Sequence, residues 1–325
     1  MAAFLHILDS LFSNHTETEE FSGTPRIGLA LSSGGAKGLA HIGVIQVLEE
    51  NNIPVAAVAG TSMGAYVGGL WAAGNSGAEL EALAAEMVSK RDLWSLVDPV
   101  FPPRRGFLRG RAIHERLEKT LEGKTFSELE MPFLAVATEF ETLERAVLDE
   151  GNVSSAILAS LAVPGIVVPV VRDGIEYIDG GVCDPLPVRL ARKAWDLDGV
   201  IAVNVLPPIG SLRSAKKKRP GGSRWRKGLR AANRHLNYFA HGNLLDILRA
   251  SAMGSQMRLV GRSAREAEVL VSAISRNSRW HDYHNYAHYI KVGREAAEAA
   301  LPEIFQLIDR AGKTADTKPE TLTRV

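Results

Sequence analysis

The 325-residue sequence has a single cysteine, Cys183, few aromatic residues and almost no net charge. One cysteine excludes an intramolecular disulfide, and no Cys/His spacing typical of zinc sites occurs, so a reducing compartment such as the cytoplasm is expected. Because the formal net charge is only +1, the protein as a whole has no electrostatic preference for nucleic acid or for an anionic surface. Any charge-driven contact has to come from a local patch.

Long apolar runs are also missing. No stretch of about 18 apolar residues occurs, so no transmembrane helix is predicted. The apolar start, residues 1–13, is short and lacks the basic region of a signal peptide. Its helical spacing favours a helix docked on its own domain over one that lies on a membrane or binds a partner. Hydrophobic residues nevertheless make up 46% of the chain and glycines number 30, enough for a large core with tight turns.

Alternating strand-like and helix-like segments predict an α/β fold, with a central, mostly parallel sheet in a three-layer α/β/α arrangement. Strands are expected at residues 26–32, 55–59, 132–138, 145–149, 176–178 and 199–205. Helices are expected at residues 39–51, 63–73, 78–90, 112–121, 154–160 and 187–195. The repeated strand-turn-helix pattern in residues 26–73 implies parallel strands joined by a right-handed crossover.

Changes in composition divide the chain into five predicted parts. These are an N-terminal helix and extension (1–23), an α/β core (24–207), a flexible basic insertion (208–240), a helical part packed on the core (241–312) and a disordered tail (313–325). The helical part is expected to contain helices at about residues 242–261 and 285–310.

The residues Gly60-Thr61-Ser62-Met63-Gly64 have the G-x-S-x-G form of a nucleophile elbow. Such a serine stands on a sharp strand-to-helix turn, and the flanking glycines leave room where strand and helix approach each other. The pattern alone is weak in a chain rich in alanine and glycine. Here an apolar strand precedes it and a helix of small residues follows, so Ser62 is predicted to be a nucleophile.

A second turn, Ser33-Gly34-Gly35-Ala36-Lys37-Gly38, joins a predicted strand to a helix N-terminus, where backbone amides can converge on one point. A phosphate or dinucleotide cradle is disfavoured, because the spacing is not that of a Walker loop and Ser33 replaces the first glycine of the dinucleotide motif. This turn and the Ser62 turn follow neighbouring parallel strands at their carboxyl ends. The amides of Gly34, Gly35 and Ala36 are therefore predicted to form an oxyanion hole, with a turn that binds nothing as the alternative.

Asp179 stands at the end of a short predicted strand, directly before Gly180 and Gly181. In isolation, an aspartate there is more often the start of a turn than a general base. None of the nine histidines follows a strand in a turn suited to a Ser-His-Asp triad, and His41 is expected to pack within the first helix. A Ser62–Asp179 dyad is therefore the more economical arrangement.

His281, His284 and His288 have a spacing that would suit a metal, but their tyrosine- and tryptophan-rich surroundings suggest a helix that faces the surface. Metal binding is not expected there. Cys183 is expected to be a small residue packed beside a loop. No metal and no organic cofactor are predicted.

Three segments together resemble the patatin-like phospholipase family, its bacterial members in particular: RIGLALSSGGAKGLAHIGVIQVLEE, GTSMGA and DGGV, in that order. The stretch ASLAVPGIVVPV also resembles the family, and the likeness spans roughly residues 26–205. By this resemblance Ser62 matches the nucleophile and Asp179 the aspartate of the dyad. Residues 34–38 match the oxyanion block, with Lys37 where arginine is common and Ser33 in place of a frequent glycine. Because the donors are backbone amides, both changes are expected to leave the hole functional.

The resemblance implies a lipid acyl hydrolase: a phospholipase, lysophospholipase or carboxylesterase acting on acyl lipids or fatty esters. Ser62 would attack the ester and Asp179 would accept its proton without a histidine, through an acyl-enzyme. An aspartate with an unperturbed pKa of about 3.9 is a weak base, so the site is expected to be partly dry. An acyltransferase using the same serine, and a non-enzymatic regulator that binds lipid or protein, are the alternatives.

The segment that begins with Lys216 and ends with Arg234 is rich in basic residues and has no acidic residue. It is predicted to be a flexible loop that either stays solvated or adsorbs to anionic head groups, each basic residue contributing about 1 kcal/mol near such a surface. Nucleic-acid binding is not expected, because no array of stacking aromatic residues accompanies the charges. The protein is therefore expected in the cytoplasm, with peripheral membrane contact through this segment.

Overall fold

The computed structural model describes residues 24–86, 98–210, 244–275 and 282–315. They form an eight-stranded mixed sheet in the order β5-β6-β3-β2-β1-β7-β8, with β4 paired to β3 outside this path. The strands are β1 (Ile27–Leu31), β2 (Val55–Thr61), β3 (Phe133–Glu139), β4 (Arg145–Leu148), β5 (Val170–Arg172), β6 (Ile175–Asp179), β7 (Gly199–Asn204) and β8 (Val269–Ser272). Strands β3, β2, β1, β7 and β8 run parallel, whereas β4 and β6 pair antiparallel with β3, and β5 pairs antiparallel with β6.

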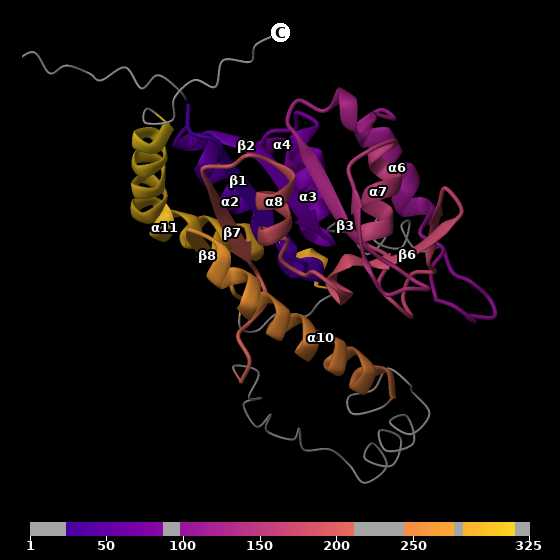
Figure 1. Cartoon of the computed structure of the whole chain (residues 1–325). Coiled ribbons are helices and arrows are strands. Elements are labelled where there is room, and N and C mark those ends of the chain that lie inside the picture. Colours follow the sequence, from indigo (N-terminus) through magenta and orange to yellow (C-terminus); the bar gives the residue numbers. More distant parts are fainter. Residues whose placement is uncertain (1–23, 87–97, 211–243, 276–281, 316–325) are drawn as a thin grey trace, which may run out of the picture.

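Helices cover both faces of the sheet (Figure 1). One face carries α2 (Ala40–Glu50), α3 (Met63–Ala72), α4 (Gly77–Ala85), α6 (Arg111–Leu121), α7 (Val153–Ser160) and α11 (Tyr286–Ala315). The other face carries α8 (Val188–Ala194) and the C-terminal part of α10 (Leu244–Ser263). The predicted three-layer α/β/α fold with a mostly parallel sheet is confirmed.

The apolar strands explain why the sheet is buried from both sides. All five residues of β1 are buried. Ile27, Leu29 and Leu31 belong to the larger core under α2 and α11, while Ala30 faces the smaller core under α8. Side chains of a strand alternate between faces, so a run without polar residues is required when helices cover both.

Two strands were not predicted, β5 and β8. Both are short, with three residues in β5 and four in β8, too few to give a clear strand pattern in the sequence. The part predicted as helical over residues 241–312 therefore also contributes β8, an edge strand parallel to β7. The first predicted helix is preceded by a 3₁₀ helix, η1 (Gly35–Leu39), and α2 begins only at Ala40.

The prediction of a surface-facing aromatic helix is wrong. Tyr289 is only 1% exposed, and Tyr283 and Tyr286 pack against the larger core. The reason is that α11 packs along α2, so its aromatic face is turned inward. His281, the predicted N-terminal helix and the basic segment from Lys216 to Arg234 lie outside the described residues.

Over the described ranges, no helix combines the length and the apolar character needed to cross a bilayer.

Candidate active site

Ser62 occupies a sharp turn between β2 and α3. Its φ of 55° and ψ of −121° are rarely adopted by a residue with a side chain, and such backbone strain costs about 1–3 kcal/mol. The turn is tight because α3 starts directly after it: a Cβ atom on Gly64 would lie 2.3 Å from the carbonyl oxygen of Leu31. A Cβ on Gly60 would in turn meet the Gly64 carbonyl oxygen at 2.5 Å. The glycines at positions 60 and 64 therefore allow the sharp turn on which Ser62 stands.

Asp179 ends β6 and lies beside that hydroxyl. Ser62 Oγ donates a 2.6 Å hydrogen bond to Asp179 Oδ2, and the backbone N–H of Gly181 donates to Asp179 Oδ1 at 2.6 Å. Both residues are 4% exposed. Burial raises the pKa of Asp179 from 3.8 to about 6, although the hydrogen bonds from Ser62 and Gly181 oppose this rise. The pKa of a carboxyl group that contacts a serine hydroxyl is thereby moved closer to neutral pH.

The antiparallel pairing of β6 with β3 sets the position of Asp179. Its register places Asp179 opposite Ala137, and Thr138 Oγ1 donates to the backbone oxygen of Asp179 at 3.1 Å. Gly180 follows, and a Cβ there would lie 2.1 Å from the Val136 carbonyl oxygen. The turn after Asp179, η3 (Gly180–Val182), can therefore pack directly on the backbone of β3.

Ser160, at the end of α7, was not predicted to matter, yet it holds the backbone of Ser62. The N–H of Ser62 donates to Ser160 Oγ at 2.8 Å, and Ser160 Oγ donates to the Val136 carbonyl oxygen at 2.5 Å. On the other side, Thr61 Oγ1 donates to the backbone oxygen of Asp184 at 2.8 Å. Ser160 lies within the family-like stretch ASLAVPGIVVPV, but that likeness gives no partner for its side chain.

The glycine-rich turn lies next to the Ser62 turn. Gly34 is the N-cap of η1, Gly35 has a φ of 57°, and Ala36 and Lys37 are buried. A Cβ on Gly38 would lie 2.4 Å from Met63 Cγ, so η1 packs against the residue that follows Ser62. The first amides of a 3₁₀ helix have no acceptor within the helix. The turn that carries these amides packs against Met63, the residue that directly follows Ser62.

The remaining candidate residues take part in packing and hydrogen bonds away from the Ser62 hydroxyl. His41 is fully buried, its Nε2 donates to the Ser32 carbonyl oxygen at 2.9 Å, and burial lowers its pKa to about 4, so it stays neutral. Cys183 packs beside η3, with its Sγ 3.0 Å from Thr138 Oγ1. Two of the three clustered histidines have polar partners. His284 Nε2 lies 2.9 Å from Asp282 Oδ1, and His288 Nε2 lies 3.1 Å from Ser275 Oγ. No group of metal-binding side chains occurs in the part of the chain that the structure describes.

Two tyrosines complete the surroundings of the site. Tyr66 lies on α3, one turn after Ser62, and Tyr283 lies in η5 (Tyr283–Asn285). Burial raises the pKa of Tyr283 to about 12, and electrostatic interactions with Tyr66 and Asp179 add to this rise. Tyr283, far along the chain, thus interacts electrostatically with Asp179.

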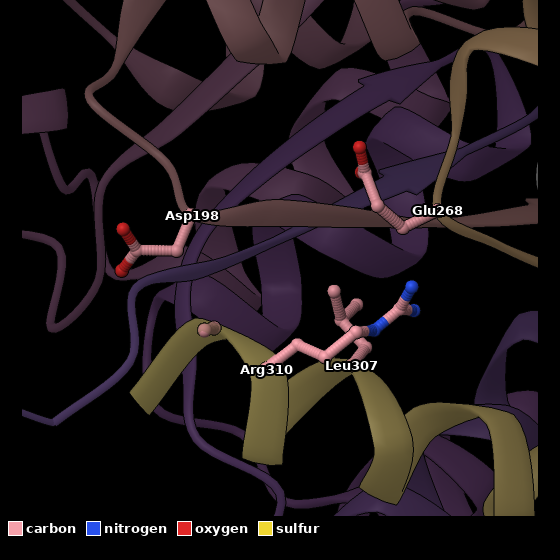
Figure 2. Close-up of a pocket in the computed structure, with 5 residues that line it drawn as sticks. Asp198, Glu268, Leu307 and Arg310 are labelled. Atoms are coloured by element: carbon pink, nitrogen blue, oxygen red, sulfur yellow. The ribbon is translucent and has the colours of Figure 1, made fainter. Parts of the chain in front are cut away.

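A cavity of about 190 Å³ lies at the opposite edge of the sheet, lined by Asp198, Glu268, Leu307, Arg310 and Ala311 (Figure 2). Its carboxylates accept hydrogen bonds from backbone amides near the starts of strands. Asp198 Oδ2 accepts from Arg26 N at 2.9 Å, and Glu268 Oε2 accepts from Val200 N at 2.7 Å. None of these lining residues is a serine, threonine or cysteine.

The sequence profile of one family, described as Patatin-like phospholipase, matches residues 29–192, just over half of the chain. The chain belongs to the patatin-like phospholipase family. The matched region contains Ser62, Asp179 and the glycine-rich turn. The earlier resemblance is confirmed.

Relatives of this family member occur in bacteria and animals. An uncharacterized NTE family protein of Mycobacterium tuberculosis is 40% identical over 186 residues, covering 56% of this chain and 50% of that protein. Patatin-like phospholipase domain-containing protein 6 of Homo sapiens is 31% identical over 184 residues, covering 55% of this chain and 13% of that protein. This chain thus spans half, or much less, of the length of these relatives. Among solved structures, VipD from Legionella pneumophila has a TM-score of 0.48 at 15% identity, covering 89% of this chain and 67% of that one.

Proposed function

We propose that this protein hydrolyses acyl esters of lipids, with Ser62 as nucleophile and Asp179 as general base. The observation that carries the proposal is the 2.6 Å hydrogen bond from the Ser62 hydroxyl, on its strained turn, to a buried carboxylate. Family membership supports the lipid class, and a relative in Mycosarcoma maydis bears the name lysophospholipase.

In the proposed reaction, Ser62 Oγ attacks the ester carbonyl carbon and its proton moves to Asp179 Oδ2. The tetrahedral intermediate collapses, the bond to the leaving alcohol breaks, and the alcohol oxygen takes the proton from Asp179. Water then attacks the acyl-enzyme, gives its proton to the same carboxylate, and Ser62 regains a proton as the fatty acid leaves. One carboxylate serves both half-reactions.

The raised pKa of Asp179 supports its role as a base. A carboxylate with a pKa of about 6 holds a proton more firmly than an ordinary aspartate but is still ionised at neutral pH. The oxyanion would be stabilised by backbone amides of Gly34, Gly35 and Ala36, with Lys37 and Gly38 completing the turn. Loss of one such donor typically costs about 100- to 1,000-fold in rate.

The decisive experiment is a hydrolysis screen across lipid classes with wild type beside Ser62→Ala. Wild type is expected to release fatty acid and to be labelled at Ser62 by a fluorophosphonate probe. Ser62→Ala is expected to lose at least about 1,000-fold of the activity. Activity that survives in a clean Ser62→Ala preparation would falsify the assignment of the nucleophile. A wild type that is neither active nor labelled would contradict the proposed function. Products formed with an added alcohol acceptor would separate hydrolysis from acyl transfer.

Peripheral contact with anionic membranes through the basic segment remains a prediction. Flotation with vesicles of anionic lipid at low and high salt tests it. Binding that is absent or insensitive to salt removes that role.

A further inference from the structure

Helix α10 lies far along the chain from Asp179, yet it contacts η3, the turn that follows this aspartate. Gly181 marks the place of contact. A Cβ atom built on Gly181 would lie 2.7 Å from Gln256 Nε2, 2.9 Å from Asp179 Oδ1 and 3.2 Å from Ser33 Oγ. Polar atoms from three separate segments therefore converge around a glycine that leaves room for them.

The Asp179 carboxylate has hydrogen-bonding capacity left on this side. Its Oδ1 accepts one hydrogen bond, from the N–H of Gly181, and a carboxylate oxygen can accept two. Ser33 is 3% exposed, and its hydroxyl has no hydrogen-bond partner within the described ranges. The side-chain amide of Gln256 carries two donor hydrogens. The Ser33 hydroxyl and the Gln256 side-chain amide are thus two hydrogen-bond donors that lie on the Oδ1 side of the Asp179 carboxylate, where Oδ1 can accept one more hydrogen bond.

We propose that Gln256 is a positioning residue for Asp179. Its side-chain amide, together with the Ser33 hydroxyl, donates hydrogen bonds on the Oδ1 side of the carboxylate, directly or through one water molecule. These bonds hold Oδ2 toward Ser62. The inference rests on the proposed function, and it makes α10 a part of the active site rather than an appendage.

Donors near Oδ1 favour the ionised carboxylate and therefore lower its pKa, against the effect of burial. A charge placed at position 256 should act more strongly, because it would lie a few ångströms from Asp179. These variants leave unchanged the other titratable or charged residues of the elements that pack around the site: Lys37, Tyr66, Arg145, Cys183, Asp184 and Tyr283. A shift in the pH profile can then be assigned to position 256.

The test compares Gln256→Glu with Gln256→Lys. The readout is the rate at which a fluorophosphonate probe labels Ser62 as a function of pH, beside the pH profile of hydrolysis. The acidic limb is expected to move to higher pH by about 0.5–1 unit with glutamate and to lower pH by a similar amount with lysine. Gln256→Leu should move it upward by less, because it removes donors without adding a charge.

Gln306 provides the matched control. It is exposed on α11, close in sequence to Leu307 of the cavity at the opposite edge of the sheet. Gln306→Glu and Gln306→Lys make the same chemical changes and should leave the pH profile where it is.

The outcomes separate this inference from the proposed function. Identical acidic limbs for the glutamate and lysine variants overturn the role of Gln256, while labelling of Ser62 upholds the nucleophile. Absence of labelling in wild type overturns the proposed function itself. If circular dichroism shows that both charge variants fail to fold, the pH profiles of Gln256→Leu and Ser33→Ala provide the test. Profiles that match wild type in both variants overturn the inference.

Discussion

Carboxylates occur at both edges of the sheet, but their surroundings differ. At the carboxyl edge Asp179 is almost fully buried, contacts a strained serine and has a pKa raised to about 6 by burial. At the amino edge Glu268 keeps 31% of its side chain exposed, pairs with Arg192 and accepts a backbone hydrogen bond at the start of β7. One carboxylate is held at a cost in free energy, and the other stabilises the edge of the sheet.

This contrast teaches that a cavity lined by charged groups is a poor guide to chemistry. The cavity beside Asp198 and Glu268 is open and lined by carboxylates already engaged with backbone and arginine groups (Figure 2). The Ser62–Asp179 pair is nearly closed to solvent, but its groups are perturbed. Perturbed and strained groups are those that a fold alone does not require.

The largest expected effect is that of Asp179→Asn, which should reduce hydrolysis by at least about 1,000-fold while stabilising the protein. Because the folded-state pKa is raised, the ionised carboxylate lowers stability as pH rises from about 4 through 6. The variant should therefore gain about 3 kcal/mol at pH 8 and less than about 1 kcal/mol at pH 4. Denaturant unfolding at both pH values measures this. A variant less stable than wild type at pH 8 would contradict the strained-site account.

Gly180→Ala is expected to have the next largest effect. The added Cβ would lie 2.1 Å from the Val136 carbonyl oxygen, so η3 must shift and carry Asp179 away from Ser62. We expect a loss of about 100-fold in kcat and about 2–3 kcal/mol in stability. Gly254→Ala on α10 is the control, since nothing lies near its Cβ position, and it should stabilise by about 0.5–1 kcal/mol. Similar behaviour of the two variants would rule out the close packing of η3.

Ser160→Ala sharpens the comparison within one helix. It leaves the buried N–H of Ser62 without its acceptor, which should cost about 1–3 kcal/mol and about tenfold in kcat. Ser154→Ala makes the same change on α7, but the buried Ser154 hydroxyl has no partner in the described structure, so the effect should be near zero. Thermal unfolding and initial rates distinguish the two, and equal losses would argue against the Ser160 contact.

The smallest effect is expected at the amino edge. Glu268→Gln weakens its ion pair with Arg192, which is partly exposed, and should cost less than about 1 kcal/mol with no change in kcat. A clear loss of activity in this variant would break the proposed separation between the two edges.

Much of the candidate site followed from local patterns. The apolar runs predicted as strands at residues 26–32 and 55–59 are neighbours in the sheet, and the turns after them carry the glycine-rich segment and Ser62 to one edge. The roles of Ser160 and Gln256 could not be predicted, because each residue approaches the site from a segment that is distant in the sequence. Strand β8 and the inward face of α11 were missed for a related reason. The residue pattern of a segment does not show which distant segment will pack against it.

By itself the sequence determined the layered α/β architecture and the short turns that bear Ser62 and Asp179, since hydrophobic periodicity and glycine spacing act over a few residues. Only the tertiary structure decided the 2.6 Å contact between their side chains, the raised pKa of Asp179 and the approach of Gln256. These depend on the register of β6 against β3 and on which helices cover the site. Distance and burial are properties of the packed chain, and no local pattern encodes them.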